Sequence, residues 1–151
     1  MKNQAFLLKF SIFSFVIVAI LGVLMRYKIA FSLPFVEQKH LQEAHSHFAF
    51  YGFITSCIYI LVAQYLSKTV EEIQMKKYQI LIGINFFASY GMLLSFLYAG
   101  YFWLSIIFST IALLNSFVYY FFLYRDLKNL QETSKIWFLA AFFFAVLSSL
   151  G

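Results

Sequence analysis

The residues most capable of chemistry in this chain are its three histidines, which lie close together in the segment KHLQEAHSH as His40, His45 and His47. A helix turns by about 100° per residue, so a helix that begins near His40 places His40, Glu43 and His47 within one sector of about 60°. Two imidazoles and a carboxylate are ligands that zinc, copper and iron accept. The spacing therefore predicts a metal site at these three residues, to be completed by further ligands.

On the same helix, His45 points almost opposite to His47. The residues that follow His45 along its stripe are small, namely Ala49, Gly52, Ser56 and Ala63. The residues that follow His47 along its stripe are bulky, namely Phe50, Tyr51, Ile54, Ile58 and Tyr65. A stripe of small residues lets another helix or a flat macrocycle approach closely. This geometry favours His45 as an axial haem ligand and His47 as a metal-binding or interfacial residue, although a tilt of the helix would reverse the order.

A structural interpretation of the histidines stands beside the functional one. Histidines at a membrane interface can simply hydrogen-bond water and lipid headgroups. Ionisable residues at membrane depth are nevertheless costly, and they mark functional sites more often there than in water. Both interpretations of His40, His45 and His47 therefore stay open from the sequence.

The elements that carry these residues must lie in a membrane. Sixty-three per cent of the 151 residues are apolar and only 11% are charged, about half the charged fraction of a soluble domain. The net charge is +5, but the basic residues are scattered in short groups between apolar runs, so a lipid bilayer is the expected partner and nucleic acid is not. The single cysteine, Cys57, excludes a disulfide framework and is expected to pack within a helix.

The apolar runs are long enough for helices that span a bilayer, which need about 20 residues. They predict an all-α polytopic transmembrane bundle of about five helices, a single domain over 1–151, with helices near 6–27, 44–66, 78–99, 101–124 and 136–151. Strands are excluded because the runs are too long and lack alternation. The first run has no small-residue cleavage site, so it is expected to stay as a helix. The third and fourth helices meet at Gly100 in a tight hairpin.

Lysine and arginine residues set the expected orientation. With the N-terminus in the cytoplasm, eight of the eleven fall on the cytoplasmic side, six of them in the loops 67–77 and 125–135. The other side receives Arg26, Lys28 and Lys39. This bias predicts a cytoplasmic N-terminus and an exterior loop at 28–43, in a membrane such as the bacterial inner membrane.

Polar residues inside the spans are expected to join helices. They are Asn85, Ser89, Ser95, Ser109, Thr110, Asn115 and Ser116. Amides and hydroxyls between membrane helices usually serve packing through hydrogen bonds. Aromatic residues near the span ends are expected to form interfacial belts, and they are Tyr27, Tyr101, Trp103, Tyr124 and Trp137.

The run from Ala44 to Phe53, AHSHFAFYGF, resembles the second transmembrane helix of subunit-I-like proteins in the haem–copper oxidase superfamily. The resemblance covers roughly residues 10 to 66 and includes the outer loop with Leu33 and Pro34. It implies that a histidine of this helix, His45 or His47, is an axial ligand of a haem. The expected function is then that of a haem-binding, respiratory-type electron-transfer module.

The chain also departs from that family. It has no histidine after His47, so it is not sufficient alone for oxidase chemistry, whose other ligands come from later helices. The last apolar run stops at Gly151 without a polar tail, which favours the N-terminal part of a larger bundle. Further transmembrane helices, from the same chain or from partner subunits, are then expected. The alternative function is a non-catalytic membrane protein for assembly or transport, whose exterior histidines bind a metal ion or are structural.

Overall fold

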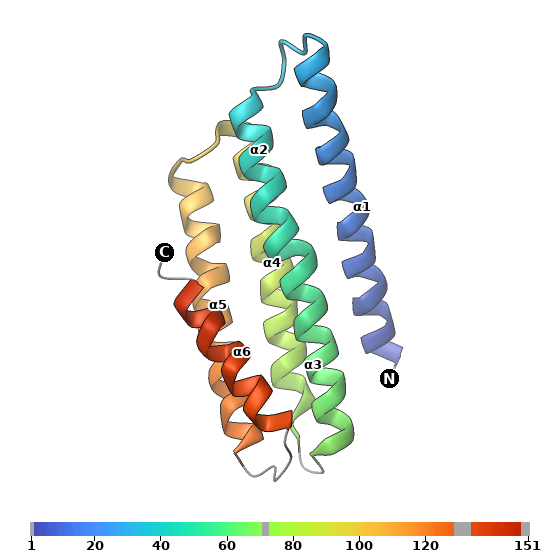
Figure 1. Ribbon diagram of the computed structural model, residues 1–151, viewed down its shortest axis with the longest axis vertical. Helices are drawn as coiled ribbons and strands as arrows, with labels where there is room; N and C mark the ends of the chain where they lie inside the picture. The colour runs from blue at the N-terminus through green and yellow to red at the C-terminus, as the bar shows by residue number, and fades with distance from the viewer. Residues whose placement is uncertain (1, 71–72, 129–133, 149–151) are drawn as a thin grey trace.

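Figure 1 shows a computed structural model of the protein, which describes residues 2–70, 73–128 and 134–148. These residues form helices and no strand. In chain order the elements are α1 (Lys2–Ala30), α2 (Gln38–His47), η1 (Phe48–Thr55), α3 (Ser56–Thr69), α4 (Met75–Ala99), α5 (Trp103–Leu127) and α6 (Ser134–Ser148). The elements α2, η1 and α3 follow one another without a break and make one long helix. The prediction of an all-α bundle of about five helices is confirmed.

Four helices in the described part of the chain are long and apolar enough to cross a membrane. They cover Ala5–Ala30, Gln38–Thr69, Met75–Ala99 and Trp103–Leu127, and they identify an integral membrane protein. Helix α6 is described over 15 residues, about 22 Å, whereas the hydrocarbon core is about 30 Å thick. The fifth crossing predicted over 136–151 is therefore not found among the described residues, and positions 149–151 lie outside them.

The long second helix begins at Gln38 rather than at the predicted position 44. The first residues of α2, QKHLQE, are mostly polar but form helix readily, so the helix continues beyond the point where hydropathy falls. The loop predicted over 28–43 is correspondingly shorter. All three histidines consequently lie within the helix. Parts of the two predicted basic loops, positions 71–72 and 129–133, lie outside the described residues.

The middle of this long helix is a π-helix, η1, which the sequence analysis did not predict. The ring of Phe48 lies against Gly52, where a Cβ atom would approach it to 2.6 Å. The carbonyl of Tyr51 accepts a hydrogen bond from the hydroxyl of Ser56 at 3.1 Å and one from the side-chain amide of Asn85 at 2.8 Å. Stretches of π-helix are often found at functional sites, and this one begins directly after His47.

The bundle has two chemically different ends, which Figure 1 shows at its top and bottom. The α1–α2 connection and the α4–α5 turn lie together at one end, here called the histidine end because α2 begins there. The start of α1 and the C-terminal ends of α3 and α5 lie at the other, the basic end. At the histidine end, the Ser105 hydroxyl donates to the carbonyl of Gly100 at 2.9 Å and accepts from the Phe102 amide at 2.9 Å, which fastens the turn.

Only some of the predicted polar contacts join helices. Asn85 donates from α4 to Tyr51, and Asn115 donates from α5 to the carbonyl of Leu81 at 3.1 Å. Four hydroxyls bond carbonyls of their own helices instead, so the prediction is wrong for Ser89, Ser95, Ser109 and Thr110. A serine or threonine hydroxyl reaches the carbonyl three or four residues earlier without any help from packing.

Helix α4 is the centre of the bundle, because it packs against α2, η1, α3 and α5. At the basic end its Lys77 forms an ion pair with Asp126 of α5 at 2.6 Å, and the Tyr78 hydroxyl donates to the same carboxylate at 2.7 Å. Helix α1 adds a contact between Ser11 and Cys57, whose Oγ and Sγ atoms lie 3.1 Å apart. These contacts hold the four spans together and so set the surroundings of the histidines.

Candidate functional site

His47 is held between α4 and the α4–α5 turn. Its Nε2 and the hydroxyl of Tyr101 lie 2.7 Å apart in a hydrogen bond. The imidazole also stacks on the ring of Phe96, with 4.4 Å between centroids and 7° between planes. One nitrogen of His47 is thus already engaged by a side chain from another part of the fold.

His40 and Glu43 lie on the side of α2 that faces the same turn. His40 Nε2 is 3.2 Å from a carboxylate oxygen of Glu37. A Cβ atom on Gly100 would lie 2.5 Å from His40 Cδ2 and 3.0 Å from Glu43 Oε2, so the turn backbone rests directly on both side chains. Glu43 Oε2 is buried without a hydrogen-bond partner.

The predicted metal site does not gain support from this arrangement. Within the described residues, no three side chains of His, Cys, Asp and Glu come together as a group that could hold a metal ion. His40, Glu43 and His47 share a side of α2, but Gly100 and Tyr101 occupy the space against them. A metal ion at these three residues therefore stays a prediction.

His45 points toward α1 rather than toward the turn. A Cβ atom on Gly22 would lie 3.3 Å from His45 Cε1 and 3.8 Å from Nδ1, whereas Nε2 is farther than 4 Å. Nδ1 is buried without a hydrogen-bond partner, and no hydrogen bond is formed at Nε2 with any described residue. His45 thus carries an imidazole with both nitrogens uncommitted, in contrast to His47.

Two cavities meet at the His47–Tyr101 pair. One, of about 350 Å³, lies at the histidine end and is lined by Lys39, Gln42, Glu43, Ser46, His47 and Tyr101. The other, of about 370 Å³, lies deeper between η1 and α5 and is lined by His47, Tyr51, Tyr101, Ile106, Ser109, Thr110 and Leu113. Because they share the two paired residues, the two cavities adjoin each other, and together they are here called the α2–α5 groove, with the first cavity as its polar mouth.

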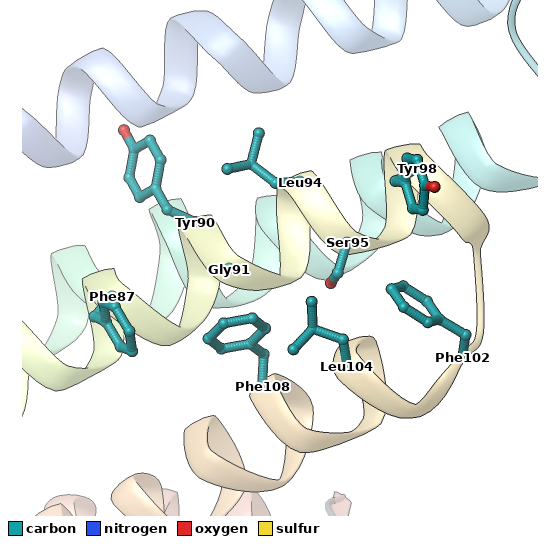
Figure 2. A pocket seen from close by; sticks show the side chains of 9 residues that line it. All are labelled: Phe87, Tyr90, Gly91, Leu94, Ser95, Tyr98, Phe102, Leu104 and Phe108. Carbon is teal, nitrogen blue, oxygen red and sulfur yellow. The ribbon is translucent and has the colours of Figure 1, made fainter.

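A third cavity, of about 420 Å³, lies between α4 and α5 and is almost wholly apolar. Figure 2 shows Phe108 reaching from α5 to Gly91 of α4, with Leu104 and Phe102 nearer the turn. A Cβ atom on Gly91 would lie 2.5 Å from the Phe108 ring, so only glycine permits this contact. With no acidic or basic side chain and no histidine in its lining, this cavity suits lipid chains rather than chemistry.

Sequence reasoning missed the partners of the histidines. Tyr101 was expected only in an interfacial belt, yet it bonds His47; Gly22 and Phe96 were not singled out. One signal was available, because the tight turn at Gly100 had to lie at the same end of an antiparallel bundle as the start of α2. Nothing in the local sequence indicated that Gly22 would lie against His45 or that Phe96 would stack on His47.

Comparison of the chain with protein-family models, with curated proteins and with solved structures finds no match. The resemblance of the AHSH segment therefore rests on its own residues.

Proposed function

We propose that this integral membrane chain is a haem-binding, respiratory-type module and that His45 is the axial ligand. The observation that carries the proposal is that the His45 imidazole forms no hydrogen bond with any described residue, although it lies in a helix long and apolar enough to span a membrane. Ionisable groups in such helices are usually paired with a partner or a ligand. His47 is the weaker candidate because Tyr101 already engages its Nε2.

The surroundings of His45 restrict where a haem fits. The contact with Gly22 leaves no room for a macrocycle between His45 and α1. His45 Nε2 lies away from that contact, so it is the nitrogen available for iron, while Nδ1 faces α1 and needs a hydrogen-bond acceptor to orient the ring. A bound haem would supply one-electron transfer, and the chain's part is to hold and orient it. Further helices, of this chain or of a partner, would cover the other side.

The expected spectrum tests this proposal. Detergent-solubilised protein from the full reading frame, expressed with ample haem, is expected to show a Soret band that shifts on reduction. His45→Ala is expected to remove the band because it removes the ligand, whereas His40→Ala and His47→Ala are expected to retain it. A colourless wild-type protein, or a band that survives in His45→Ala, would contradict the proposal.

The second candidate function is a non-catalytic membrane protein for assembly or transport. The contacts of His47 favour it, since stacking on Phe96 and bonding to Tyr101 are what a structural histidine needs. Retention of the fold with no haem and no metal bound would point to this function.

We also propose that the basic end of the bundle is cytoplasmic, because lysine and arginine gather there. In a Cys57→Ala background, Ser32→Cys lies at the histidine end and Ser67→Cys at the basic end, and both positions are exposed. A membrane-impermeant maleimide applied to intact cells is expected to label Ser32→Cys and to spare Ser67→Cys until the cells are opened. The reverse pattern would invert the orientation.

A further inference from the structure

The α2–α5 groove carries opposite charges at its mouth that do not neutralise each other. Lys39 and Glu43 are one helical turn apart and both line the mouth. The ion pairs in the described part of the chain join His40 to Glu37 and, at the basic end, Lys77 to Asp126, so neither Lys39 nor Glu43 forms one with a described residue. A positive and a negative group side by side are complementary to a zwitterion.

Glu43 in particular lacks a donor. Its Oε2 is buried beside Gly100 without a hydrogen-bond partner, and its carboxylate also lines the groove. A partly buried carboxylate is stabilised by charge-assisted hydrogen bonds, which are stronger than neutral ones. A cationic group with N–H donors in the groove would supply such bonds to this carboxylate.

The depth and polarity of the groove fit a lipid better than a soluble molecule. From Lys39 to Tyr51 the groove follows twelve residues of the long helix, roughly 18 Å. One leaflet contributes about half of the 30 Å hydrocarbon core, so the groove is about as long as one leaflet is thick. Its inner part adds Ile106 and Leu113, which suit an acyl chain.

We propose that the α2–α5 groove is a binding site for a phospholipid with a phosphate and a primary ammonium group, that is, a phosphatidylethanolamine. The phosphate lies at Lys39, the ammonium donates to the carboxylate of Glu43, and one acyl chain passes His47 and Tyr101 to rest on Ile106 and Leu113. The site is on the other side of α2 from His45, so it does not depend on haem binding.

Quenching of tryptophan fluorescence by brominated lipid tests the proposal. Trp137→Phe leaves Trp103, which is two residues from Tyr101 and exposed, as the single tryptophan. The protein is reconstituted in phosphatidylcholine bilayers that contain brominated phosphatidylethanolamine or, at the same mole fraction, brominated phosphatidylcholine. We expect the ethanolamine lipid to quench as if it bound about two- to fivefold more tightly, the effect of one partly exposed charge pair.

Two matched variants test whether the preference for the ethanolamine lipid depends on Glu43. Glu43→Gln is expected to bring the two lipids to equal quenching, because the neutral amide attracts the ammonium group much less. Glu37→Gln makes the same change of charge at the same end but outside the groove, so it is expected to retain the preference. Loss of the preference in both variants would show a general surface-charge effect and would overturn the proposal.

A lipid series on a chain with Glu43 intact gives a second measurement, which decides the question if Glu43→Gln fails to fold. Successive N-methylation of the ethanolamine group removes N–H donors one by one but keeps the positive charge. We expect the preference to fall with each methyl group. Equal quenching across the series, or stronger quenching by brominated phosphatidylglycerol, would overturn the proposal. Competition by soluble glycerophosphoethanolamine would show instead that the headgroup alone is the ligand and would refute the lipid.

Discussion

Replacing Gly100 by alanine is expected to lower the free energy of unfolding by about 3 kcal/mol or more. Gly100 has φ 61° and ψ −137°, a backbone conformation that residues with a Cβ atom rarely adopt. The new Cβ atom would also lie 2.5 Å from His40 Cδ2 and 2.8 Å from His40 Nε2. Backbone strain and this overlap act together, so the turn has to move away from α2 and weaken the bond between Tyr101 and His47.

A denaturing-detergent titration in mixed micelles, followed by far-UV circular dichroism, measures this loss. The control is Gly83→Ala, because Gly83 is exposed in the middle of α4 and has no atom within 4 Å of an added Cβ. That change is expected to be neutral or to stabilise by about 0.5–1 kcal/mol. Adding His40→Ala to Gly100→Ala is expected to recover only the part of the lost stability that comes from overlap of the new Cβ atom with the His40 ring. Equal stability of the two glycine variants would contradict the structure of the turn.

Replacing Asn85 by leucine is expected to lower the free energy of unfolding by about 2 kcal/mol. The Asn85 amide donates to the Tyr51 carbonyl at 2.8 Å and to the Ser56 hydroxyl at 2.9 Å. Leucine has a similar size but no donor, so the carbonyl exposed by the π-helix keeps only its longer bond from Ser56. The Tyr51 carbonyl, which loses the hydrogen bond from Asn85, is a backbone group within a membrane protein, so water cannot replace the missing donor.

The same titration compares this variant with Ser89→Ala. Ser89 lies one turn further along α4 and is equally buried, but its hydroxyl donates to Phe86 of its own helix. Its removal is expected to change stability by less than about 0.5 kcal/mol. A double-mutant cycle of Asn85→Leu with Ser56→Ala then isolates the coupling between the two side chains. An Asn85→Leu loss as small as that of Ser89→Ala would mean that the amide does not support η1.

The sequence predicted the helices better than the site they carry. Hydropathy predicted the hairpin at Gly100 and spans close to those observed, because apolar length is a local property. It placed the start of the second helix too late, since the polar residues before Ala44 continue the helix into the interface. The sequence predicted His45 as a haem ligand, but it did not predict which residues lie against the histidines. Tyr101 bonds His47 because the fold brings the α4–α5 turn against α2.

The amino-acid sequence by itself determined that the chain is a bundle of membrane helices and that His45 and His47 point to different sides. Both follow from local physics: backbone groups in lipid must bond within their own helix, and a helix turns by a constant angle. Only the tertiary structure decided that His47 meets Tyr101, that His45 meets Gly22, and that the helix widens at η1 beside Asn85. In lipid almost every helix face is apolar, so hydropathy does not distinguish one neighbour from another, and close packing and a few interhelical hydrogen bonds make the choice.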